Sequence, residues 1–210
     1  MDFALNRSLF LKNGKGNYRD DEPLIIPGAA QGICNNKLFT QDVRLLSRTE
    51  KPYLLLHVNG RRTIEIICSR RELENNESHT HSFWKGARFL SVMTYLDSYA
   101  IRTKRDYGYD ETHLWGIEWE STYNCVPGNV AYVRVPTLIV GMTENRELLA
   151  SELIYTMSAS SDKSVAFVEG RANNDSLAGS FESAKGPDRE SLKIMYDYID
   201  EWLWESGRFL

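Results

Sequence analysis

The sequence predicts an α/β fold, because two apolar strands alternate with two helices in its last third. The run VPTLIVGM, Val135 to Met142, is continuously apolar, as expected for a strand that is covered on both faces. A second strand, SVAFVEG, is expected over 164–170. Apolar residues at helical spacing follow each strand, over 146–158 and from 189 to about 205. The order strand, helix, strand, helix implies a parallel pair of strands in an α/β sheet.

A β-hairpin is expected over 52–69, where two apolar, β-branched arms flank Asn59 and Gly60. Asn-Gly is the preferred pair for a type I′ turn, because both central residues of that turn need a positive φ. The segment DVRLLSRT before the hairpin is a candidate for a third strand, and LIIP at 24–27 for a buried strand end.

The middle of the chain is less regular. Residues 72–82 are polar and are expected to form an exposed loop. A helix is predicted over 85–102, because apolar residues recur there at helical spacing: Phe89, Val92, Met93, Leu96 and Ala100. Residues 103–130 mix aromatic side chains with Gly, Asp, Glu and Asn, and are expected to be irregular. These aromatic side chains could line an apolar acyl pocket, but they more often pack a lid or cap onto a core.

Composition narrows the classes of function. The chain has 210 residues and a formal net charge of −4, so it has no excess of positive charge that would favour binding to nucleic acid. No apolar run is long enough to span a membrane. The three cysteines, Cys34, Cys68 and Cys125, are far apart, which disfavours a zinc ribbon or a disulfide framework. Reduced thiols and a cytoplasmic location are the simplest expectation.

The last third also resembles the C-terminal end of the α/β-hydrolase family, over about Tyr132 to Phe209. "VPTLIVGMTEN" is similar to the seventh strand of that family, and "SASSDKSVAFVEGRAN" to the following helix end and eighth strand. The closing helix with "YIDEWL" is similar as well. The resemblance implies a partial hydrolase-like parallel sheet with terminal helices. In this organisation 1–37 is a loop-rich segment, 38–130 is a cap-like segment and 131–210 is the β-α-β-α unit.

The resemblance also implies where catalytic residues would stand. The acid of the family follows the strand glycine by three positions, which gives Glu144 after Gly141. The histidine follows the second turn glycine by three positions, which gives Asn173 after Gly170. An amide cannot accept a proton near neutral pH, so general-base catalysis is not expected at this position. The serine motif G-x-S-x-G is absent from the sequence.

The first hypothesis is therefore a truncated or catalytically degenerate relative of serine esterases that act on ester or similar acyl substrates, with no cofactor and no metal. A second hypothesis is a non-catalytic binding protein. The missing strands would leave one side of the parallel sheet open, and that edge needs a partner, a second copy, or the chain's own hairpin at 52–69. A third is that the gene begins further upstream, where an in-frame G-x-S-x-G would revive catalysis.

Other candidate side chains have simpler explanations. Glu144 also suits a solvated position at the start of a helix. His79 and His81, with Glu77 nearby, have a spacing that some metal sites use, but a solvated loop is the better interpretation. His57 is expected to have a cross-strand partner rather than a catalytic role. His113 could replace the lost histidine only if the fold carried it over the end of the sheet.

Overall fold

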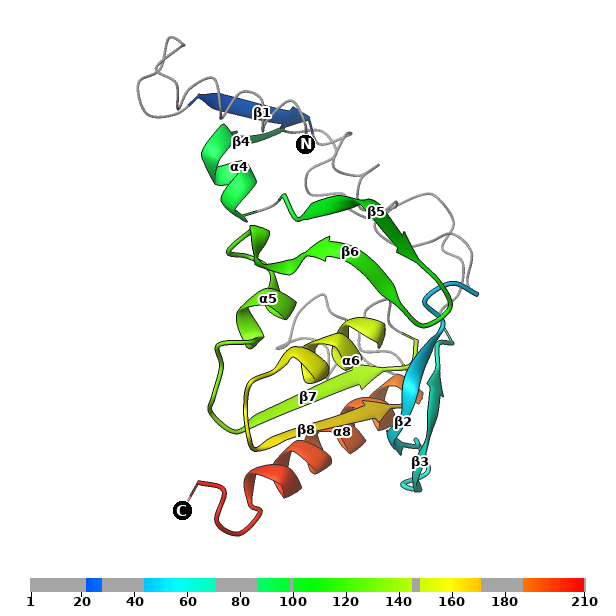
Figure 1. Cartoon of the computed structure of the whole chain (residues 1–210). Helices are drawn as coiled ribbons and strands as arrows, with labels where there is room; N and C mark the ends of the chain where they lie inside the picture. The colour runs from blue at the N-terminus through cyan, green and yellow to red at the C-terminus, as the bar shows by residue number, and fades with distance from the viewer. Residues whose placement is uncertain are drawn as a thin grey trace. The chain divides into compact units, whose positions relative to one another are not determined.

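The structure is a computed structural model that describes residues 22–27, 44–70, 87–98, 100–144, 148–170 and 187–209 (Figure 1). Over these residues the fold is mixed α/β, with eight strands in three small sheets and four α-helices. The chain divides into two compact units, which are described separately. Unit 1 comprises Met1–Asp42, Leu73–Gly108 and Leu114–Asn129, and unit 2 comprises Val43–Glu72, Tyr109–His113 and Val130–Leu210.

Unit 2 contains a four-stranded mixed sheet in the order β3-β2-β8-β7. The strands are β2 (Arg48–Leu56), β3 (Arg62–Cys68), β7 (Thr137–Met142) and β8 (Lys163–Val168). β7 and β8 run parallel, as the sequence predicts, with Thr137 beside Lys163 and Met142 beside Val168. β2 is also parallel to β8, and β3 is antiparallel to β2. The hairpin therefore covers one edge of the parallel pair.

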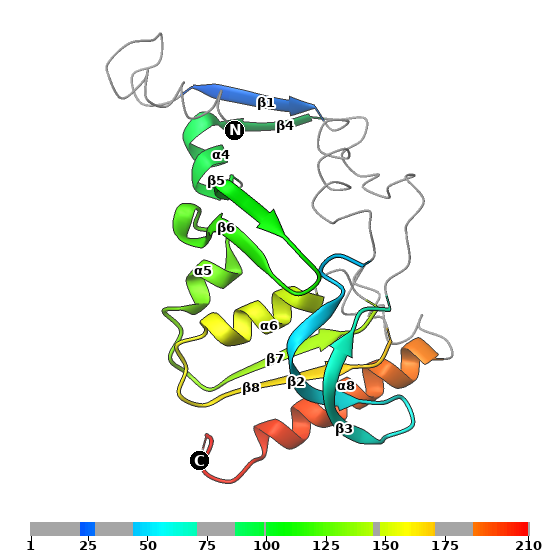
Figure 2. The same ribbon diagram turned by 45° about the vertical axis from the view of Figure 1, so that its right-hand side comes forward.

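Two helices cover the two faces of this sheet (Figure 2). On one face, α6 (Leu148–Met157) packs with Leu55 and Phe167. On the other face, α8 (Pro187–Leu203) packs with Leu56 and Val168. Successive residues of a strand point to opposite faces, so neighbouring side chains of β2 and β8 enter different cores. The order β7-α6-β8-α8 matches the predicted strand, helix, strand, helix unit.

The hairpin is confirmed, but the predicted turn type is wrong. The His57 N–H donates to the Arg61 carbonyl at 2.9 Å, and the Gly60 N–H donates to the His57 carbonyl at 2.9 Å. Gly60 has a φ of 81°. Among the non-glycine residues of the described ranges only Leu46 has a positive φ, so the φ of Asn59 is negative. Asn59 therefore does not take the conformation that a type I′ turn needs. A three-residue loop with one left-handed glycine joins the strands instead.

The predicted third strand over 42–49 is also not found as a separate element. Residues 44–46 form a turn, and β2 itself begins at Arg48. β2 has an irregular register between Arg48 and Pro52. Here the N–H groups of Glu50 and Lys51 donate to the carboxylate of Glu152 on α6, at 3.1 Å and 3.3 Å. The buried Glu152 side chain thus satisfies backbone donors at the irregularity of β2.

Unit 1 contains a small antiparallel sheet of β1 (Pro23–Pro27) and β4 (Ala87–Ser91). β1 falls on the predicted strand LIIP, although its residues alternate between exposed and half-buried. The helix predicted over 85–102 is correct only for α4 (Val92–Ser98). The residues before it pair with β1, a long-range contact that helical spacing within one segment cannot reveal.

The expectation of irregular structure over 103–130 is wrong. β5 (Arg102–Tyr109) and β6 (Leu114–Glu118) form a two-stranded sheet, followed by the 3₁₀ turn Trp119–Ser121 and the short helix α5 (Val126–Val130). A Cβ added at Gly108 would lie 2.4 Å from the Trp115 ring, so glycine allows the indole to pack across the strand. Residues 1–21 and 71–86, with the predicted loops there, lie outside the described residues.

Candidate functional site

Polar side chains gather in unit 2 where the parallel strands end. His57 follows β2, Thr143 follows β7 and Glu169 follows β8. The ends are joined by backbone hydrogen bonds, from Thr143 N–H to the Val168 carbonyl at 3.0 Å and from Glu169 N–H to the Leu56 carbonyl at 2.9 Å. Open α/β sheets place their ligand sites outside the carboxyl ends of the strands, so this is the region to test for chemistry.

Glu169 is the centre of this cluster, and only 16% of its side chain is exposed. One carboxylate oxygen accepts from the Arg70 guanidinium at 2.5 Å. The other lies 3.3 Å from His57 Nδ1 and accepts from the Val58 N–H at 3.3 Å. Burial favours a higher pKa for Glu169, but the Val58 N–H, Arg70 and His57 outweigh it and lower the pKa of this carboxyl.

The imidazole of His57 links this carboxylate to a hydroxyl. His57 is buried, with 8% of the residue exposed, and its Nε2 lies 2.8 Å from the Thr63 hydroxyl on β3. The Thr63 hydroxyl in turn donates to the Glu65 carboxylate at 2.5 Å. The expectation of a cross-strand partner for His57 is confirmed. The order carboxylate, imidazole, hydroxyl is also the order of a catalytic triad.

The hydrogen-bond roles decide what this arrangement can do. The Thr63 hydroxyl has one proton, and the Glu65 carboxylate at 2.5 Å is nearer to this hydroxyl than His57 Nε2 at 2.8 Å. His57 Nδ1 faces the Glu169 carboxylate, which can only accept a hydrogen bond. Glu65 therefore competes with His57 for the Thr63 proton. In this arrangement the cluster, which we call the His57 clamp (His57, Thr63, Glu65, Arg70 and Glu169), fastens the hairpin to β8.

Glu144, the candidate acid, follows β7 and is half-buried. Its N–H donates to the Gly170 carbonyl at 3.0 Å, so the loops after β7 and β8 meet. Gly170 has φ 112°, and a Cβ there would lie 2.2 Å from the hydroxyl of Ser191 on α8. Glycine is therefore needed where α8 closes on this loop. Asn173 lies outside the described residues.

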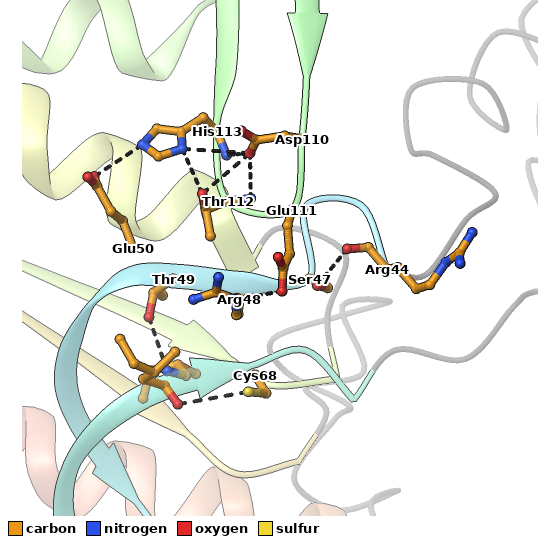
Figure 3. Close-up of polar contacts among 12 residues, drawn as sticks. Arg44, Ser47, Arg48, Thr49, Glu50, Cys68, Asp110, Glu111, Thr112 and His113 are labelled. Carbon is orange, nitrogen blue, oxygen red and sulfur yellow. Dashed lines mark hydrogen bonds and ion pairs between the residues drawn. The ribbon is translucent and has the colours of Figure 1, made fainter.

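His113 lies in a different polar cluster, at the turn of the β5–β6 hairpin (Figure 3). Its Nε2 is 3.4 Å from Glu50, and its imidazole is half exposed. Nearby, the Arg48 guanidinium donates to Glu111 at 2.6 Å. The carboxylate of Asp110 accepts the N–H groups of Thr112 and His113, which lower the pKa of Asp110. The cluster fastens the hairpin tip to β2. Within the described residues, the His113 imidazole contacts Glu50, Asp110 and Thr112 and none of the residues of the His57 clamp.

The remaining candidates are a possible metal site and the cysteine thiols. Glu77, His79 and His81 lie outside the described residues. Within the described ranges, no group of three or more His, Cys, Asp or Glu side chains is arranged to hold a metal ion. Cys68 is exposed and Cys125 is buried, and both are free thiols. None of the helices that the structure describes combines the length and apolar character needed to cross a bilayer.

Sequence reasoning missed the pairing of His57 with Glu169. The signal was present in part, since each residue directly follows an apolar strand. Only the parallel pairing of β2 with β8 brings these two strand ends together. Comparison of the chain with models of known protein families, with curated proteins and with solved structures found no match in any of the three.

Proposed function

We propose that the chain is a catalytically degenerate α/β-hydrolase-like protein, related to serine esterases that act on ester or similar acyl substrates. The observation that carries this proposal is the meeting of the loops after β7 and β8, where Glu144 N–H donates to the Gly170 carbonyl. A triad needs its acid and its histidine loop side by side in this way. The position of the histidine in that loop is Asn173, and the sequence has no G-x-S-x-G.

The layering of unit 2 supports the same proposal. β7 and β8 are parallel, and the helices that follow them cover opposite faces of the sheet. A unit that keeps this arrangement of strands and helices but lacks the serine nucleophile and the histidine base cannot begin an acyl transfer through a triad. In the His57 clamp, Glu65 competes with His57 for the Thr63 proton, so we do not propose the clamp as a replacement for the missing base.

Turnover of a panel of acyl esters, from short to long chains, tests the proposal. We expect hydrolysis no faster than that caused by the same concentration of chemically unfolded chain, which controls for exposed nucleophiles. Ester turnover above this background that disappears in a His57→Gln variant would mean that the clamp acts as a general base. That result would overturn the proposal.

A second candidate function is protein interaction through β7. β7 is the end strand of the sheet in the part of the chain that the structure describes, and it has no charged residue. An uncharged edge strand is a template for pairing with another chain. Size-exclusion chromatography tests this function, and a monomer at all concentrations would argue against self-association.

A further inference from the structure

The two edges of the four-stranded sheet differ in chemistry. β3 has Arg62 and Glu65 along its length, and Arg62 pairs with Glu201 at 2.9 Å. β7, with the sequence TLIVGM, contains no charge, no proline and no break in its register with β8. Charged side chains on an edge strand discourage pairing with other strands, whereas β7 has none of these protective features.

Among the residues that the structure describes, no strand lies beside β7 on the side away from β8, and this side can be assigned to particular backbone groups. The N–H groups of Thr137 and Thr143 donate to β8, at 2.9 Å to Asp162 and 3.0 Å to Val168. In a parallel pair alternate residues of a strand point to the same neighbour, so odd-numbered residues face β8. The N–H and carbonyl groups of Leu138, Val140 and Met142 therefore point away from β8. Another extended backbone can satisfy such a row of donors and acceptors in full.

A second copy of β7 fits this edge for two reasons. When two identical strands pair antiparallel about a twofold axis, charges of the same sign often face each other, but an uncharged strand avoids this repulsion. The twofold pair also uses β7 of both copies, and the outer strand of the joined sheet is then the charged β3 on each side. A contact of this kind closes after two copies instead of growing into a fibre.

We propose that the chain forms a symmetric dimer in which β7 pairs antiparallel with β7 of a second copy, joining the two four-stranded sheets into one. The proposal rests on the interaction function proposed for β7. The dimer does not depend on the absence of ester hydrolysis. The dimer and the proposal of a catalytically degenerate hydrolase-like protein can therefore fail separately. β7 packs against α6, where Gly141 lies beside Ser151, and against α8 through Val140 and Met142, which makes it resemble an interior strand.

Three variants test the dimer in sedimentation velocity experiments. Leu138→Pro removes one outward N–H of β7, and Leu138→Ala shortens the same side chain but keeps that N–H. Ile64→Pro is the matched control on β3, because the antiparallel register with β2 also directs the Ile64 N–H outward and its side chain is 76% exposed. We expect a dimer of the 24.2 kDa chain for the wild type, Leu138→Ala and Ile64→Pro, and a monomer for Leu138→Pro.

A wild-type chain that is monomeric at every concentration overturns the proposal, as does a dimer that survives Leu138→Pro or dissociates with Ile64→Pro. If Leu138→Pro does not fold, hydrogen exchange of the wild type decides. We expect exchange of the Val140 and Met142 amides to slow as the concentration rises, while the Ile64 amide exchanges fast throughout. Fast exchange at Val140 and Met142 at all concentrations would contradict the dimer.

Discussion

Glu152 and Glu169 hold the two ends of β2 to the rest of unit 2, and they do so with different partners. Glu152 accepts backbone N–H groups at the irregular start of the strand. Glu169 accepts from Arg70, His57 and one backbone N–H at its carboxyl end. The second group has the residue types of an active site, but its contacts join the β2–β3 hairpin to the end of β8. Residue types alone therefore do not identify a proton relay, and the direction of each hydrogen bond is needed as well.

The largest effect is expected for Glu152→Ala, which leaves the N–H groups of Glu50 and Lys51 without their acceptor. We expect a loss of about 3 kcal/mol in the free energy of unfolding, measured by urea denaturation. Glu152→Gln keeps an acceptor oxygen, so it should cost roughly 1 kcal/mol less. If both variants unfold at the wild-type urea concentration, Glu152 does not support the start of β2.

A somewhat smaller loss, about 2 kcal/mol at neutral pH, is expected for Glu169→Gln, because Arg70 and His57 lose a charged partner. Glu50→Gln is the control, since its carboxylate is about half exposed, and it should change stability by less than ~0.5 kcal/mol. Equal losses for the two variants would mean that the clamp contributes no more than a surface contact.

The loss in Glu169→Gln should depend on pH. The folded-state pKa of Glu169 is lowered, so just below pH 4.5 the folded chain binds fewer protons at this group than the unfolded chain. Its contribution is present above that value and disappears as the pH falls through the lowered pKa. Urea denaturation of wild type and variant over this range should therefore give converging stabilities. A constant difference between them would exclude a charged Glu169 as the source of the stability.

The smallest effect is expected for Thr63→Val, which removes the hydroxyl between His57 and Glu65. We expect a loss of about 1 kcal/mol and no change in background ester hydrolysis. Thr63→Ser, which keeps the hydroxyl, is the control for the change of shape. A fall in ester hydrolysis in Thr63→Val but not in Thr63→Ser would indicate a relay at His57 instead of a joint.

The sequence is most informative where structure is set locally. The continuous apolar run of β7, the second strand β8 and the spacing of α6 and α8 all predict the elements that the structure contains. The helical spacing around Phe89 misleads, because β4 is fixed by its pairing with β1, more than sixty positions earlier in the chain. β5 was missed because its side chains are mostly exposed on both faces, so it lacks the alternation of a half-buried strand.

The candidate site was less predictable than the fold. Glu144 could be placed by counting from Gly141, since both belong to one strand and its loop. The His57 clamp depends on β2 lying beside β8, and these strands are more than one hundred positions apart. Its roles also depend on Glu65, which lies 2.5 Å from the Thr63 hydroxyl and competes with His57 for its proton. Neither strand order nor the direction of a hydroxyl proton can be read from residue order.

The most direct test of the proposed function is intact-mass spectrometry of the folded chain after treatment with a fluorophosphonate, which labels activated hydroxyl nucleophiles. A degenerate hydrolase-like chain, with no G-x-S-x-G serine and with Asn173 at the histidine position, should keep its unmodified mass of 24.2 kDa. A stoichiometric adduct on Thr63 or on any serine, absent from a His57→Gln variant, would show that an activated nucleophile exists and would contradict the account.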